Sequence, residues 1–268
     1  MPVDAYRPFP DARTYIWQMD TESNPPYMNY TPGWDLATIV PLRKYASQTI
    51  YNPLLVNGLM GQAFRHYTPS GLPMGHLENY SPGGVAMIPL YPQFSVDFWI
   101  IFEPAIYQYG FLPTSNNIIH YGNIGWSGLW GTGFRISLDH LLNGESQIRF
   151  TIASVPTTMY GIAFSSFLGP IPAGLRWRHI ACVCEGSPNT TMKIFIDGIL
   201  SGSLTTGLPF SYDPTNPAVS SLLKIGGSGF ANDTMDWSID TTRIISNYAM
   251  PESFWRETVY NGPMLTRT

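Results

Sequence analysis

The chain has 268 residues, of which only 12% are charged and 14% are aromatic, and its formal net charge is −4. No run of five or more basic residues occurs, which argues against nucleic-acid binding, because that requires clustered Lys and Arg. No apolar run approaches the roughly 18 residues of a membrane-spanning helix, so no membrane partner is expected.

Lysine is rare in this sequence. Among 14 basic residues only Lys44, Lys193 and Lys224 are lysines. Arg, Tyr and Trp are the residue types enriched at protein interfaces, whereas Lys is depleted there. We therefore expect much of the surface to contact neighbours, including copies of the same chain in a homo-oligomer.

Residues 1–12 are predicted to form an extended arm, because three prolines interrupt them and no hydrophobic periodicity is present. Tyr6, Arg7 and Phe9 supply large contact areas at interfaces, so this arm is expected to clamp a neighbouring subunit. The segment lacks the basic stretch and apolar core of a signal peptide, which predicts synthesis in a host cytoplasm.

Residues 13–259 are predicted to form one β-rich domain. The first strand is expected at 14–19, and two Pro- and Gly-rich loops follow at 21–54 and 68–84. At 94–102, apolar residues alternate with Ser95, Asp97 and Trp99, which predicts a strand with one face in the core. Further alternating runs between 118 and 164 bring the total to about a dozen strands.

The segment 177–203 predicts two strands and a tight hairpin. Residues 180–184 are apolar or small on both faces, which indicates a strand covered on both sides. Asp197-Gly198 is the strongest short signal for a type I′ turn. Cys182 and Cys184 are two residues apart on this strand, so buried reduced thiols are expected and a disulfide is not.

The C-terminal part is predicted to hold one short helix at 251–259, which begins at Pro251 and carries Glu252 near its positive end. Residues 260–268 are expected to form a tail that contributes to assembly and not to the fold.

Several of these pieces together resemble the laminin-G-like, concanavalin A-like lectin and glucanase domains. The core signature is Trp-x-His-Ile-Ala at 177–181 with Ile-Phe-Ile-Asp-Gly at 194–198, and flanking strands at 94–100, 223–227 and 239–244 match in order. The resemblance implies an all-β, two-sheet antiparallel jelly-roll sandwich with long loops and a short C-terminal helix. Bacteriophage virion proteins carry domains of this kind.

Catalysis is not expected. Glucanases of this fold carry paired carboxylates on one strand for acid and nucleophile roles, and no glutamate here stands in a Glu-x-Asp-x-Glu pattern. His179 occupies the family's Trp-x-His position, where a structural hydrogen bond is favoured over a catalytic role.

Two segments are candidates for ligand contact. Trp126 and Trp130 stand in a Gly-rich stretch and would stack on a sugar or on a neighbouring subunit, the second being favoured. Asp233 and Asp236 lie in an oxygen-rich stretch that would suit a weak calcium site, although a solvated turn is favoured. No cofactor or metal is therefore expected.

These observations lead to two functional hypotheses. The first is a non-enzymatic structural component of a bacteriophage virion, either a capsid decoration protein or a tail or fibre protein, with other virion proteins as partners. The alternative is a lectin-like, carbohydrate-binding module that attaches to host-surface glycans.

Overall fold

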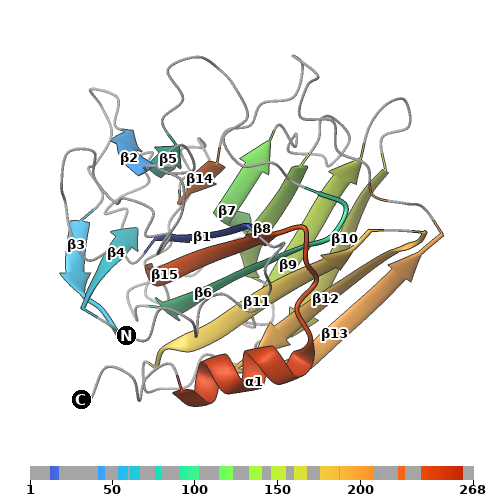
Figure 1. Ribbon diagram of the computed structural model, residues 1–268. Helices are drawn as coiled ribbons and strands as arrows, with labels where there is room; N and C mark the ends of the chain where they lie inside the picture. Colours follow the sequence, from blue (N-terminus) through green and yellow to red (C-terminus); the bar gives the residue numbers. More distant parts are fainter. Residues whose placement is uncertain are drawn as a thin grey trace.

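Two antiparallel β-sheets make up most of the described part of the chain, as the computed structural model shows (Figure 1). The structure describes residues 13–17, 42–45, 54–59, 61–66, 76–79, 91–102, 115–122, 133–140, 146–154, 160–167, 176–186, 188–207, 210, 223–226 and 237–261.

Sheet A has eight strands. Its strands in spatial order are β13 (Ile199–Thr206), β12 (Thr190–Ile196), β11 (Arg178–Glu185), β6 (Phe94–Phe102), β15 (Trp237–Ser246), β4 (Gln62–His66) and β3 (Leu54–Asn57), and β1 (Arg13–Trp17) also pairs with β15. One edge of β15 pairs with β6, and the other pairs with β4 at 237–239 and with β1 at 242–246. Strand β15 is therefore central, although it is the last strand described.

Sheet B has seven strands. Its strands in spatial order are β10 (Tyr160–Phe167), β9 (Ser146–Ser154), β8 (Gly133–His140), β7 (Ser115–Gly122), β14 (Leu223–Ile225), β5 (His76–Asn79) and β2 (Leu42–Tyr45). The short strand β14 thus lies between two strands that come much earlier in the chain.

The main core fills the space between the sheets. Phe94, Val96, Phe98 and Ile100 of β6 are fully buried there, as the alternation in the sequence predicted. The Phe94 ring lies 5.1 Å from the Phe134 ring of sheet B, centroid to centroid. Such large apolar side chains each contribute about 1.5 to 3 kcal/mol on burial, so this interface holds the two sheets together.

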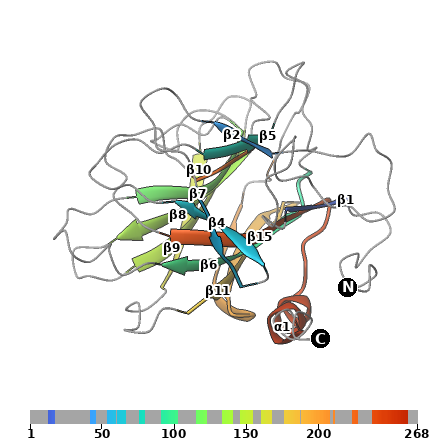
Figure 2. The same cartoon turned by 90° about the vertical axis from the view of Figure 1, so that its left-hand side faces the viewer.

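A second, smaller core lies on the outer face of sheet A, beneath helix α1 (Glu252–Asn261). Trp255 of the helix is fully buried against Ala181 and Val183 of β11 and Phe195 of β12. Figure 2 shows the helix end-on, outside the sandwich. Strand β11 is therefore covered on both faces, as predicted.

The structure confirms the predicted fold class and the predicted hairpin. Asp197 and Gly198 have φ values of 51° and 76°, the left-handed conformation that a type I′ turn requires at both positions. Cys182 and Cys184 are buried and unbridged, and burial raises the pKa of both thiols.

The helix predicted at 251–259 is present and continues to Asn261. Within the described ranges, no helix has both the length and the apolar character needed to cross a membrane. The arm residues Tyr6, Arg7 and Phe9 lie outside the described residues, as do positions 262–268.

Candidate functional site

The outer face of sheet B carries a row of polar side chains that runs across five strands. In register these are Glu78 of β5, Lys224 of β14, His120 of β7, Arg135 of β8 and Thr151 of β9, and we call them the polar row. Their neighbours along each strand, such as Leu77, Leu223, Tyr121, Phe134 and Phe150, are buried in the main core. Because successive side chains of a strand point to opposite faces, the polar row points away from the core.

A fixed ion pair lies beside the row. Arg149 Nε is 2.8 Å from Asp139 Oδ2, and the same carboxylate accepts hydrogen bonds from Ser137 Oγ at 3.4 Å and Gln147 Nε2 at 3.5 Å. Asp139 is only 4% exposed, so these contacts offset the cost of its burial. The charge of Arg149 is thus neutralised locally.

At the other end of the row, Glu78 has a partner as well. His76 Nε2 lies 3.2 Å from Glu78 Oε2, and both residues belong to β5. The two carboxylates on this face, among the residues described, are therefore both engaged with neighbouring side chains.

Arg135 differs from Arg149 and Glu78, because it has no such side-chain partner in the described ranges. It is 7% exposed, yet it makes no hydrogen bond or ion pair with any residue in the described ranges, and its Nε is buried without a partner. Burial lowers the pKa of its guanidinium, the nearby Arg149 lowers it further, and Asp139 opposes the shift. Buried polar groups are normally hydrogen-bonded, and a buried charge without a partner is costly.

Thr151, the next member of the row, shows the same feature. Its side chain is 2% exposed and its Oγ1 has no hydrogen-bond partner within the described part of the chain. Thr151 and Arg135 pair directly across β8 and β9. Two adjacent buried groups that can donate hydrogen bonds thus have unused hydrogen-bonding capacity.

The row is electropositive. Lys224, Arg135 and Arg149 carry permanent positive charges, whereas Glu78 and Asp139 are the acidic groups that the structure places on this face. Burial lowers the pKa of His120 to about 4, and the charges of Lys224, Arg135 and His76 act in the same direction. His120 is therefore neutral at pH 7.

Solvent reaches this face around Arg135. His120, Lys224, Arg149 and Gln147 are all partly exposed, and the Arg149 side chain retains 38% of its accessible surface. The arrangement is a set of outward hydrogen-bonding groups on a rigid sheet, suited to holding an oxygen-rich ligand. No cluster of His, Cys, Asp and Glu that could hold a metal ion occurs among the described residues.

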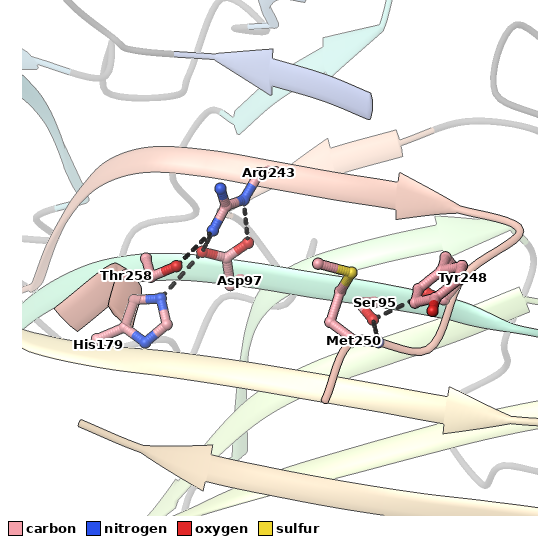
Figure 3. A network of polar contacts seen from close by, with 7 residues as sticks. All are labelled: Ser95, Asp97, His179, Arg243, Tyr248, Met250 and Thr258. Carbon is pink, nitrogen blue, oxygen red and sulfur yellow. Dashed lines mark hydrogen bonds and ion pairs between the residues drawn. The ribbon is translucent and has the colours of Figure 1, made fainter. Parts of the chain in front are cut away.

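A second polar cluster lies under helix α1 (Figure 3). Asp97 of β6 accepts hydrogen bonds from Arg243 Nε at 2.8 Å and Arg243 Nη2 at 2.9 Å. His179 Nε2 lies 2.9 Å from the same carboxylate, which is the structural hydrogen bond predicted for this residue. Burial alone would raise the pKa of Asp97, but the charge of Arg243 and the hydrogen bonds from His179 and Arg243 together hold it below its ordinary value.

This second cluster joins structural elements and is closed to solvent. The side chains of Asp97, His179 and Arg243 are at most 5% exposed. Arg243 Nη2 also reaches Thr258 Oγ1 of the helix at 3.5 Å, and Ser95 accepts a hydrogen bond from Met250 N at 2.9 Å. Its contacts tie β6, β11, β15 and α1 together, so we assign it to the fold and the polar row to the candidate site.

The residues singled out as candidate contacts in the sequence, Trp126, Trp130, Asp233 and Asp236, all lie outside the described residues. The segment 123–132 that contains both tryptophans joins β7 to β8. Its flanking residues Gly122 and Gly133 pair with each other, two positions from His120 and Arg135. Gly122 and Gly133, the described residues on either side of this segment, therefore lie near the polar row.

The polar row was not predicted from the sequence. The signal was present within each strand, since Arg135 stands between Phe134 and Ile136, and Arg149 between Ile148 and Phe150. Which of these positions lie side by side depends on the strand order, and that order is not encoded locally.

No protein-family model matches the chain, and no curated protein sequence does. Solved structures do share its fold. The receptor-binding domain of botulinum neurotoxin type G is similar, with a TM-score of 0.59 and 11% identity, over 92% of this chain and 51% of that one. The binding domain of botulinum neurotoxin DC, solved in complex with SialylT, has a TM-score of 0.59 and 15% identity, over 93% and 51%.

The binding domain of a paraclostridial mosquitocidal protein is also similar, with a TM-score of 0.55 and 14% identity, over 85% of this chain and 50% of that one. This chain thus spans about half the length of each of these structures. At these identities the likeness establishes a β-sandwich fold shared with binding domains.

Proposed function

We propose that the chain is a non-enzymatic binding domain that takes a surface carbohydrate on the outer face of sheet B. The observation that carries this proposal is the polar row, in which hydrogen-bonding side chains from five strands stand in register on one face. Strands lie about 4.8 Å apart, so the row extends for about 20 Å, enough for more than one sugar ring. The fold shared with a receptor-binding domain, and with a binding domain solved in complex with SialylT, supports this proposal.

The chemistry of the row suits a sugar. Sugar hydroxyl groups both donate and accept hydrogen bonds, and His120, Lys224 and Thr151 offer matching groups from a rigid sheet. Trp126 and Trp130, which belong to the segment joining β7 and β8, are proposed to add an aromatic surface against a sugar face.

The acidic groups on this face favour binding over hydrolysis. A glycosidase requires one carboxyl group to act as an acid and a second to act as a nucleophile or base. Here Asp139 is held by Arg149, and Glu78 lies against His76. Neither carboxylate has the separate environment that distinguishes an acid from a base.

A glycan array probed with the full chain tests the proposal. Lys224→Met removes a positive charge from the polar row, so binding should weaken. Lys193→Met is the matched control, because Lys193 pairs with Glu185 in sheet A, away from the row. Absence of binding to any glycan, or equal binding by both variants, would contradict the proposal. Release of a shortened glycan would contradict its non-enzymatic part.

We propose a structural role in a bacteriophage virion as the second candidate, with other virion proteins and copies of the chain as partners. Strand β13 supports it, because β13 ends the strand order of sheet A and exposes apolar side chains. Ile199 is 62% exposed, Leu200 41% and Leu204 36%, and the strand Ile199–Thr206 contains no charged residue. An uncharged edge strand is a ready surface for pairing with another chain.

Leu204→Lys tests this second candidate, because a charge on an edge strand opposes strand pairing. We expect sedimentation to shift from oligomer to monomer, and the variant to be lost from purified particles. A wild-type chain that is monomeric at all concentrations and absent from particles would rule this candidate out.

A further inference from the structure

We propose that the ligand of the polar row is an acidic carbohydrate, and that its anionic oxygen group lies against Arg135. This inference rests on the carbohydrate-binding function proposed above and names the class of sugar. We infer the class of sugar from the charges and the hydrogen-bonding groups of the polar row.

Arg135 is buried, and its Nε has no hydrogen-bond partner among the described residues. Arg135 as a whole residue is only 7% exposed. The neighbouring Arg149, by contrast, is neutralised by Asp139 at 2.8 Å. Removing a charge from water without a partner is unfavourable by several kcal/mol in typical proteins. Such a residue is expected where a ligand supplies the missing counter-charge.

Arg135 has a polar neighbour on each of the two adjacent strands. His120 flanks it on β7, and Thr151 flanks it on β9, in direct register on both sides. Adjacent strands are about 4.8 Å apart, so one small group lying over Arg135 can contact both neighbours. The unpartnered Oγ1 of Thr151 is then placed to donate a hydrogen bond to the same group.

The Arg135 guanidinium and the Thr151 hydroxyl can both donate a hydrogen bond to an oxygen acceptor on the ligand. A guanidinium presents a planar fork that matches two oxygens of one carboxylate, sulfate or phosphate group. A neutral sugar hydroxyl accepts a hydrogen bond but leaves the positive charge uncompensated. Charge therefore selects an acidic sugar over a neutral one, and both a sugar carboxylate and a sugar sulfate share the required oxyanion.

Titration of the isotope-labelled full chain by NMR, at constant ionic strength, tests the inference with four probes. These are D-glucuronate, D-glucose 6-sulfate, methyl β-D-glucoside and acetate. We expect D-glucuronate or D-glucose 6-sulfate to bind at least about tenfold more tightly than the neutral glucoside, because the glucoside cannot form a charged hydrogen bond with Arg135 through an anionic group of its own. The two acidic probes decide between carboxylate and sulfate.

Arg135→Gln should reduce the affinity for the acidic probe to that of the neutral glucoside. Arg256→Gln is the matched control, because Arg256 is exposed on helix α1 and pairs with Glu252 there. It should bind as the wild type does. In the absence of ligand, Arg135→Gln should also raise the melting temperature, since it removes an uncompensated buried charge. A fall in melting temperature with affinity unchanged would identify Arg135 as structural and overturn the inference.

The probes also separate this inference from the proposed function. Equal binding of glucuronate and glucoside would leave carbohydrate binding standing and overturn the acidic class. Equal binding of glucuronate and acetate, lost in Arg135→Gln, would support an anion site but contradict a carbohydrate ligand. If none of the probes binds, the inference is wrong, and the glycan array then decides the broader function.

Discussion

Arg243 binds the carboxylate of Asp97 through two nitrogen atoms, at 2.8 and 2.9 Å, although the two residues lie 146 positions apart in the chain. The pair joins β6 to β15 in the middle of sheet A and is almost fully buried, with side-chain exposures of 4% and 5%. Removing Arg243 takes away both of these hydrogen bonds and leaves the buried Asp97 carboxylate with the contact to His179 Nε2 at 2.9 Å.

Arg243→Ala should therefore destabilise the protein by about 3 to 5 kcal/mol, the range typical of breaking a buried ion pair. The measurement is equilibrium urea unfolding. Arg256→Ala provides the control, since its pair with Glu252 is exposed and should contribute less than about 1 kcal/mol. Similar losses in both variants would mean that burial does not determine the contribution of the Asp97 pair.

Gly198→Val should destabilise the hairpin between β12 and β13. Gly198 has a φ of 76°, and a Cβ atom there would lie 2.9 Å from Arg256 Cα and 3.0 Å from the Trp255 carbonyl oxygen. Backbone strain and this overlap with helix α1 should together cost about 2 kcal/mol or more. Thermal unfolding followed by circular dichroism measures the loss.

Gly207→Ala is the control for this substitution, because nothing lies within 4 Å of a Cβ atom placed there. Its melting temperature should remain within the error of the wild type. An unchanged melting temperature for Gly198→Val would count against the close contact between the turn and the helix.

Stability should fall as the pH is lowered from about 6.5 to about 4, because of His120. Burial and neighbouring positive charges lower its pKa from 6.5 to about 4 in the folded protein. In that pH window the unfolded chain binds a proton that the folded chain does not, so acid favours unfolding. The loss is complete below about pH 4 and amounts to at most about 3 kcal/mol.

His120→Gln should reduce the dependence of the free energy of unfolding on pH between 6.5 and about 4. Acid unfolding below that range should remain. The pKa of Asp97 is held below its model-compound value of 3.8, so the stability that this carboxylate contributes is lost only at still lower pH. Urea unfolding at intervals between pH 7 and pH 3 separates the two effects. A profile identical to that of the wild type would contradict the shift assigned to His120.

The two terminal segments are predicted to serve assembly and not the fold. A chain limited to residues 13–261, which keeps β1 and the whole of helix α1, should unfold within a few degrees of the full chain. The lost arm contains Tyr6, Arg7 and Phe9, so this shorter chain should fail to join an oligomer or particle. Light scattering and co-sedimentation measure assembly. Insolubility, or assembly equal to that of the full chain, would show that the prediction is wrong.

The parts of the fold that the sequence predicted are those set by local chemistry. Asp197-Gly198 identifies its own turn, and the alternation in β6 identifies its buried face without reference to any other strand. The same alternation separated Ser95 and Asp97 from the core, and these residues do face the second core beneath helix α1.

The candidate site could not be assembled in this way. His120 and Arg135 are neighbours through a local hairpin, but Lys224 joins them only because β14 lies between β7 and β5. Likewise, Asp97 gives no local sign that Arg243 is its partner. The role proposed for Arg135 rests on its lack of a hydrogen-bond partner for Nε among the described residues, which a sequence does not reveal.

The place of β15 in sheet A governs when the protein can fold. Strand β15 separates β6 from both β1 and β4, and β1 has no other partner among the described strands. During synthesis the edges of β1, β4 and β6 that pair with β15 must therefore remain unpaired until residues 237–246 have left the ribosome. Pairings over such long sequence separations form slowly, and waiting strand edges are prone to aggregation. The nascent chain is thus expected to depend on chaperones until β15 closes the sheet.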